Sequence, residues 1–269
     1  MGGLGMRTLR GLRYELSNAL RSRSFWSYVV VCVLMCISGY VQGGMFDGAF
    51  GLLAGLVRVS PEDISMEKAI RWLMPHLLLS VYMGECGERD LRMQRLSLPR
   101  CASFRSYWRF QALKLLLISL MYYALIVLGA ALVSAALGNR LPKVSEAALA
   151  WHGLYSGMLP GAWAMMLEVS LRAALAMALV GLAQLALTWL TGDQRWGMAA
   201  FAALMLAPLF VADARVLRAL PCDMAMYLRS GAVSDGLNLM WMCAICVAAG
   251  LAIIEALCVA ARLRTVLVN

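Results

Sequence analysis

Long stretches without a charged side chain dominate this sequence, and they restrict the fold more than any other feature. A helix needs about 20 apolar residues to cross a bilayer. The chain is 62% hydrophobic and only 14% charged, whereas a soluble domain is about 25% charged. The sequence therefore predicts an all-α integral membrane protein with one domain over residues 1–269. Six membrane spans are expected, at residues 24–42, 69–86, 112–137, 168–191, 196–212 and 237–260.

Two segments leave the number of spans open. The uncharged part of the second span covers only residues 72–84, so Arg71 and Glu85 must extend to opposite interfaces if it crosses. Pro75 predicts a kink inside this span. Residues 147–167 are also free of charge, but several glycines and a proline interrupt them. We expect an interfacial segment there, because a seventh crossing would move every later loop to the other side of the membrane.

The distribution of positive charge predicts the orientation in the membrane. When the N-terminus is placed in the cytoplasm, the inner segments carry about twice as many Lys and Arg residues as the outer segments. The difference in Lys and Arg content is strongest in the first half of the chain, where it has most influence on the orientation. We therefore expect the N-terminus and the C-terminus to be cytoplasmic.

A basic amphipathic helix is expected before the first span, over residues 6–22. Leu9, Leu12, Leu16 and Leu20 share one helical face, and arginines lie off it. Such a helix lies in the interface of a membrane and forms an elbow with the span that follows. A secretory signal peptide is the competing interpretation, but no small-residue cleavage site follows the apolar run.

The sequence contains no motif of a common catalytic or metal site. It has no P-loop, no H-E-x-x-H and no nucleophile elbow. Cys243 and Cys246 have the spacing of a redox or metal pair, but they lie mid-span without a charged neighbour. We therefore expect no catalytic residue, no metal site and no cofactor in this chain. The net charge of +9 alternates with apolar runs, which favours membrane orientation over nucleic-acid binding.

Three of the charged residues within the predicted spans are candidate polar sites. Glu168 and Arg172 are four residues apart near the outer start of the fourth span, where pairing avoids a desolvation cost. Glu255 lies about two turns before Arg262 in the last span. Glu255 either lines a pathway or contacts another subunit, or its side chain extends to the inner interface.

Residues 87–109, GERDLRMQRLSLPRCASFRSYWR, place six arginines between the second and third spans. This segment is longer than a turn between two membrane helices requires, and Pro99 predicts a break in it. A short charged helix followed by a proline turn suits a contact with a soluble partner. Alternatively, the arginines only hold the loop in the cytoplasm. The expected contact residues are Glu88, Arg89, Asp90, Leu91, Arg92, Arg95, Leu98, Pro99 and Arg100.

This layout resembles the type-2 ATP-binding-cassette (ABC) permease family. Members of that family have a basic amphipathic helix before six spans and a cytoplasmic loop between the second and third spans. Their loop begins with acidic and basic residues, continues with leucine, proline and arginine, and ends in a lysine. The matching residues here are Glu88, Arg89, Leu96, Leu98, Pro99, Arg100 and Lys114. The sequence departs from the family in having Leu91 and Arg92 where Gly-Thr often follows the acids, and in its long segment 138–167.

The resemblance implies a permease subunit of an exporter. It implies a second permease chain, identical or not, and cytoplasmic ABC ATPase subunits that bind ATP and Mg²⁺ and dock on the coupling loop 87–109. Bacterial immunity permeases against peptide antibiotics are similar in size and layout, which implies a multi-pass protein of a bacterial cell membrane. The alternatives are a stand-alone secondary transporter and a membrane anchor or sensor without an ATPase partner.

Overall fold

The computed structural model describes residues 2–43, 66–97, 103–136, 162–207, 214–218, 220–226 and 236–268. These residues form helices, and no strand occurs among them. The helices are α1 (Gly2–Arg21), α2 (Arg23–Gly43), α4 (Met66–Ser97), α5 (Phe104–Ala136), α7 (Ala162–Thr191), α8 (Gln194–Leu206), α9 (Ala214–Leu217), α10 (Pro221–Met224) and α11 (Leu239–Val268).

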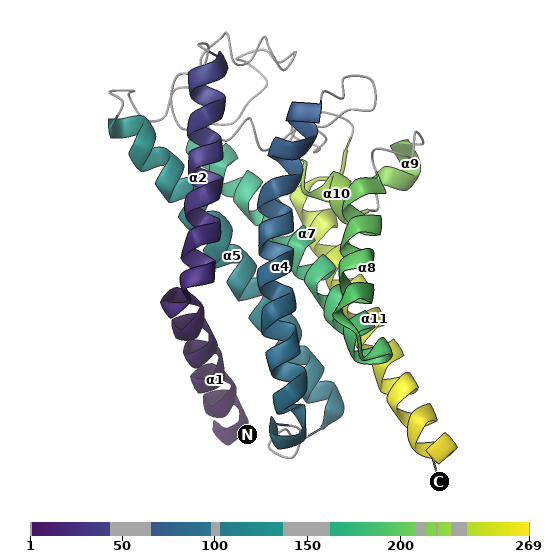
Figure 1. The fold of residues 1–269 in the computed structure, drawn as a ribbon. Coiled ribbons are helices and arrows are strands. Elements are labelled where there is room, and N and C mark those ends of the chain that lie inside the picture. Colours follow the sequence, from purple (N-terminus) through teal and green to yellow (C-terminus); the bar gives the residue numbers. More distant parts are fainter. Residues whose placement is uncertain are drawn as a thin grey trace.

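The long helices form one bundle and run in alternating directions (Figure 1). The helix α4 descends, α5 ascends, α7 descends, α8 ascends and α11 descends. Both termini and the connection from α4 to α5 therefore lie at one end of the bundle, which is the lower end in Figure 1. We call this end the basal end. The end of α5 and the start of α7 both lie at the opposite end, whereas the intervening residues 137–161, with most of the expected interfacial segment, are outside the described residues.

The N-terminal helix is separated from α2 by a bend of 64°. Ser22 interrupts the two helices, and its hydroxyl accepts a hydrogen bond from the backbone N–H of Phe25 at 3.4 Å, as an N-cap does. The indole of Trp26 donates to the carbonyl of Leu20 at 2.7 Å, which satisfies an acceptor at the end of α1. The cap on one helix and the indole contact on the other fix this break.

The predicted apolar face of α1 is only partly covered. Leu12 is buried and Leu16 is half-buried, while Leu9 and Leu20 are exposed. Gly11 lies against the ring of Phe110 on α5, at 3.2 Å from the position of an added Cβ. The helix predicted over residues 6–22 is thus present and packs against α5. Its placement in a membrane interface stays a prediction.

Three described helices are long and apolar enough to cross a membrane. They cover residues 104–133 in α5, 166–191 in α7 and 239–263 in α11, and the bent pair α1 and α2 gives a fourth if it counts as one span. The helix α8 has 13 residues and is too short to cross by itself. In α4, charged residues near both ends shorten the apolar stretch. The chain is therefore an all-helical protein with three to four candidate spans, and the six-span layout stays a prediction.

The helices extend beyond several predicted spans. The helix α4 continues through Ser97, and α5 begins at Phe104, so most of the segment 87–109 is helical rather than a loop. The helix also continues through Pro75. Conversely, α8 ends at Leu206, and the rest of the predicted span 196–212 lies in 208–212, outside the described residues. Pro208 follows this end, and the residue before a proline disfavours the α conformation.

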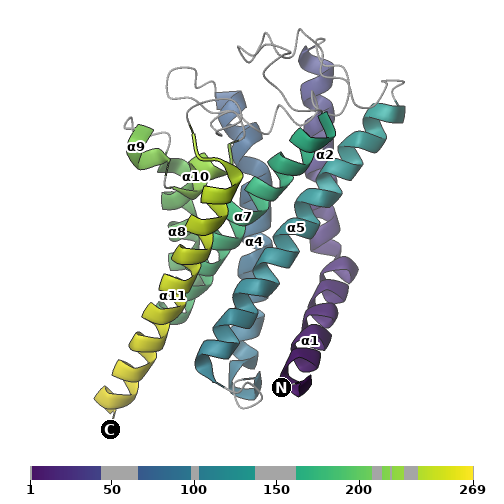
Figure 2. The ribbon, with the colours of Figure 1, turned by 180° about the vertical axis from the view of Figure 1, so that it is seen from behind.

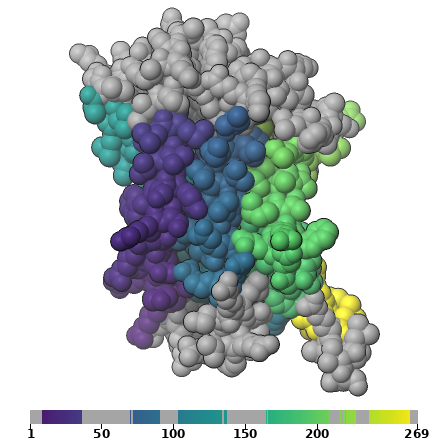
Figure 3. All heavy atoms as spheres, viewed as in Figure 1, coloured from purple at the N-terminus to yellow at the C-terminus, as the bar shows by residue number. Residues whose placement is uncertain are grey.

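The helix α7 occupies the centre of the bundle. It contacts α4, α5, α8, α10 and α11, and Figure 2 shows it crossing between α5 and α11. In the most apolar stretch of α7, 67% is buried inside the bundle, whereas in the most apolar stretch of α11 only 28% is buried. A helix that is apolar on all sides needs such cover when it is surrounded by other helices. On the opposite face, α2, α4 and α8 lie side by side, as the space-filling view shows (Figure 3).

Glycines allow the closest contacts of α7. A Cβ added at Gly181 would lie 2.5 Å from the sulfur of Met83 on α4. A Cβ added at Gly197 on α8 would lie 2.5 Å from the hydroxyl of Thr188 and 2.8 Å from the carbonyl oxygen of Gln184. Small residues let membrane helices approach each other in this way.

Candidate functional site

The basal parts of α4 and α5 are held together by a buried ion pair. The ammonium of Lys114 on α5 donates to the carboxylate of Asp90 on α4. The Lys114 side chain is 2% exposed and the Asp90 side chain 15%. Lysine is almost never fully buried without a partner. Lys114 is buried, and Asp90 is its partner. Asp90 was expected to contact a separate protein; in the structure its carboxylate pairs with Lys114 of α5, and the expected contact stays a prediction.

Arg89 is one of the predicted docking residues, and its side chain faces outward. Its side chain is exposed, and one guanidinium nitrogen lies 3.5 Å from the Cys86 sulfur as a donor. Partial burial lowers the pKa of Arg89, whereas the acidic groups of Cys86, Glu15 and Asp90 raise it by more, so that the pKa lies above its ordinary value. Arg89 is therefore a permanent positive charge on this surface.

The other predicted docking residues differ in what the structure describes. Glu88 is half-buried on α4 and already has a polar or charged contact. The backbone of Leu91, Arg92 and Arg95 belongs to the last turns of α4. Leu98, Pro99 and Arg100 lie outside the described residues. Glu88, Arg89 and Asp90 thus lie on α4, which continues from the bundle. Lys114 on α5 joins them through its pair with Asp90.

Two further contacts tie α4 and α5 to neighbouring helices. The phenol of Tyr28 on α2 donates to the Glu85 carboxylate on α4 at 3.3 Å. The Arg105 guanidinium on α5 donates to the Glu255 carboxylate on α11. Glu255 therefore pairs with another helix of the same chain, and both side chains of that pair are 47% exposed. Neither of the expectations that it lines a pathway or contacts another subunit gains support from this position.

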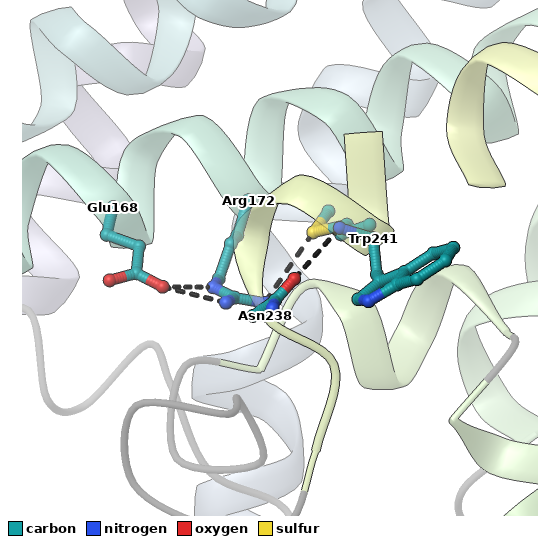
Figure 4. Close-up of polar contacts among 5 residues, drawn as sticks. Glu168, Arg172, Asn238 and Trp241 are labelled. Atoms are coloured by element: carbon teal, nitrogen blue, oxygen red, sulfur yellow. Dashed lines mark hydrogen bonds and ion pairs between the residues drawn. The ribbon is translucent and has the colours of Figure 1, made fainter. Parts of the chain in front are cut away.

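The second predicted polar group, Glu168 and Arg172, is an ion pair within α7 (Figure 4). The Arg172 Nε donates to the Glu168 carboxylate at 2.8 Å, and Nη2 lies 2.7 Å from the same oxygen without the geometry of a hydrogen bond. The Nη1 group lies 3.7 Å from the sulfur of Met242 on α11. Arg172 is 1% exposed, so the pair keeps a buried charge neutralised near the start of α11.

The start of α11 beside this pair is capped. Asn238 accepts a hydrogen bond from the backbone N–H of Trp241 at 2.9 Å through its side-chain oxygen, as an N-cap does (Figure 4). The pair and the cap together fix where α11 begins relative to α7. This arrangement is suited to holding two helices in register, and nothing in it exposes a reactive group.

A buried polar cluster joins α4, α7 and α8, and the charge-based sequence reasoning missed it. The Ser80 hydroxyl donates to the Gln184 side-chain oxygen at 2.8 Å, and the Gln184 amide donates to the Ser80 carbonyl at 3.2 Å. The same amide lies 3.4 Å from the Met198 sulfur. Uncharged polar side chains inside an apolar run are the signal that would have indicated these residues.

A second missed cluster lies between α2, α4 and α5. The Tyr122 hydroxyl donates to the Pro75 carbonyl at 3.2 Å and lies 3.0 Å from the Cys32 sulfur. The His76 Nδ1 shares a hydrogen bond with the Tyr123 hydroxyl. The His76 Nε2 is buried and has no hydrogen-bond partner in the described part of the chain. The cluster surrounds the internal proline of α4 and joins this helix to α2 and α5.

No group of three or more His, Cys, Asp or Glu side chains could hold a metal ion in the part of the chain that the structure describes. Cys243 and Cys246 are free cysteines on α11, and the Cys246 sulfur lies 3.8 Å from the sulfur of Met224. The basal surface around Arg89 is the candidate functional site, because an exposed charged residue of the predicted docking set lies there.

Comparison with known proteins gave no match to a family model, to a curated protein or to a solved structure.

Proposed function

We propose that this chain is the membrane-spanning permease subunit of an ABC exporter. In this proposal α1 lies at the inner interface, six segments cross the bilayer, and both termini face the cytoplasm of a bacterial cell. The alternating directions of the long helices support the layout, because each pass ends where the next begins (Figure 1). The excess of Lys and Arg in the basal segments supports a cytoplasmic basal end.

The observation that carries the proposal is the continuity of α4 from the bundle interior to its charged end. The helix passes through the Ser80 and Gln184 cluster and the glycine contacts with α7, and then the outward-facing Arg89 and the Asp90–Lys114 pair follow each other near its charged end. A partner that moves this end therefore moves buried side chains of α4, α5 and α7 together. A rigid helix with discrete packing is the element through which such a motion is transmitted.

The partners follow from this role. Cytoplasmic ABC ATPase subunits would bind ATP and Mg²⁺ and contact the basal surface, and a second permease chain would complete the path for the cargo. This chain would supply no catalytic group. A coupled change requires that the ATP-bound and nucleotide-free ATPase states interact differently with the basal surface.

The test is co-purification of the tagged full chain with an ATPase when the genes flanking its own are co-expressed. We expect a P-loop ATPase to be retained, and R89E to reduce its capture at least tenfold, because a reversed charge opposes an interface formed around a cation. The control is R218E, since Arg218 is also exposed but follows α9 at the opposite end of the bundle. R218E should retain the ATPase at the level of the unmodified chain.

Two results would contradict the proposal. Equal capture by R89E and the unmodified chain would remove the basal surface from the interface. Absence of any ATPase from the unmodified chain, purified folded, would favour the stand-alone secondary transporter or the membrane anchor.

A further inference from the structure

An apolar groove lies between α5 and α11, with α7 as its floor. Its cavity volume is about 270 Å³. Three helical faces line it, and the main contributors are Leu113, Leu116, Leu179, Leu182, Val247 and Leu251. Figure 2 shows the face of the molecule on which α5 and α11 lie, with α7 crossing between them.

The groove opens toward the medium that surrounds the bundle. Leu113 is 40% exposed on one wall, and Val247 and Leu251 are exposed on the other. These residues belong to helices that are long and apolar enough to cross a membrane. In a bilayer, such an opening at this depth faces hydrocarbon, so the natural occupant of the groove is an acyl chain.

A single cation stands at the basal end of the groove. Arg109 lines it one turn of α5 before Leu113, and its side chain is exposed. No hydrogen bond or ion pair to Arg109 occurs within the described ranges. One further turn toward the basal end, Arg105 and Glu255 pair across α5 and α11 and neutralise each other. Among the described residues, no side chain therefore compensates the positive charge of Arg109 where the apolar surface ends.

The size of the groove argues against a bulky guest. Pockets for drug-sized ligands measure about 300–1,000 Å³, and 270 Å³ lies just below that range. One stretch of acyl chain fits this volume. Basic pockets between membrane helices on the cytoplasmic side bind anionic head groups.

We propose that this groove is a binding site for one anionic phospholipid, with an acyl chain between α5 and α11 and the phosphate group on Arg109. The site is independent of the transporter proposal, because it requires only that α5 and α11 cross a membrane. Arg109 provides the selectivity for the head group. The apolar wall contacts hydrocarbon whether or not this lipid is bound, so it does not distinguish one lipid from another.

The experiment is native mass spectrometry of the full chain in detergent micelles, titrated with phosphatidylglycerol or with phosphatidylcholine of the same acyl chains. We expect tighter binding of phosphatidylglycerol to the unmodified chain. R109Q should lower that preference about fivefold, with a smaller effect on phosphatidylcholine, because the choline cation already offsets the charge of its phosphate. G250L should weaken both lipids equally, because Gly250 lines the groove and an added Cβ there has only an ordinary contact, 3.8 Å from Leu182.

The matched control is R195Q, which removes another exposed arginine at the basal end, on α8. This variant should bind both lipids like the unmodified chain. If R195Q and R109Q lose the preference for phosphatidylglycerol equally, general surface charge explains that preference, and the proposal is overturned. A lipid-free dimer that G250L dissociates would overturn it in favour of a second copy as the occupant, and equal binding of both lipids by the unmodified chain would also overturn it.

Discussion

At the residue scale, two ion pairs in the basal part of the bundle differ in how far they are buried. Asp90 and Lys114 are almost fully enclosed, whereas Arg105 and Glu255 are each 47% exposed. Water screens the exposed pair and solvates either partner when the other is lost. The enclosed pair has no such substitute, since a charge left alone in a buried site bears its full desolvation cost.

Replacement of Asp90 by alanine should therefore destabilise the protein strongly. Removing one partner of a buried pair costs about 3–5 kcal/mol, and the Lys114 ammonium would remain where it is 2% exposed. The free energy of unfolding, measured by denaturation in mixed micelles, gives the size of this effect. In E255A, which breaks the exposed pair, the same measurement should show no change beyond its error.

The double variant D90A/K114M distinguishes a lost charge pair from lost packing. Because a buried pair is often replaced by apolar side chains without loss of stability, we expect the double variant to recover most of the stability lost in D90A. The same unfolding measurement applies. If D90A and D90A/K114M are equally unstable, the buried charge is not the cause.

Some residue-level contacts could be predicted from the sequence, and others had no local signal. Glu168 and Arg172 were expected to pair, since four residues bring two side chains to one face of a helix, and this prediction is confirmed. Ser80 and Gln184 are 104 residues apart. Which of the many polar residues within apolar runs meet each other depends on the packing of whole helices, which the sequence pattern does not specify.

At the element scale, the sequence predicted where helices occur better than where they end. Span limits were placed at charged residues, although Arg, Lys and Glu are good helix formers once a helix has begun. The run GERDLRMQRLS therefore continues α4 instead of starting a loop. A bend ends the predicted basic amphipathic helix, and the side chains of Ser22 and Trp26 lie at that bend.

The contact between α7 and α8 depends on the absence of a side chain at one position. G197A would place a Cβ 2.5 Å from Thr188 Oγ1 and 2.8 Å from a backbone oxygen of Gln184, so the helices must separate. We expect a loss of about 1–3 kcal/mol in the free energy of unfolding. G250A is the control, since its Cβ meets nothing closer than 3.8 Å. Equal stability of G197A and the unmodified chain would contradict close packing of α7 and α8.

At the scale of the whole molecule, the alternating helices predict which connections share a compartment. A green fluorescent protein fused after Thr191 or at the C-terminus should fluoresce, because both positions lie at the basal end. Alkaline phosphatase fused after Ala136 should be active, because α5 ends on the other side. Active phosphatase after Thr191 would show that residues 147–167 cross the membrane and would refute the six-span layout.

The central position of α7 also has a consequence for biosynthesis. Ribosomes make α2, α4 and α5 before α7, and α8 and α11 after it. Until residue 191 has been added, the surfaces of Ser80 and Met83 that α7 covers have no partner in the nascent chain. We therefore expect a chain that stops before Ala162 to leave these surfaces of α4 uncovered and to be less stable than the full chain.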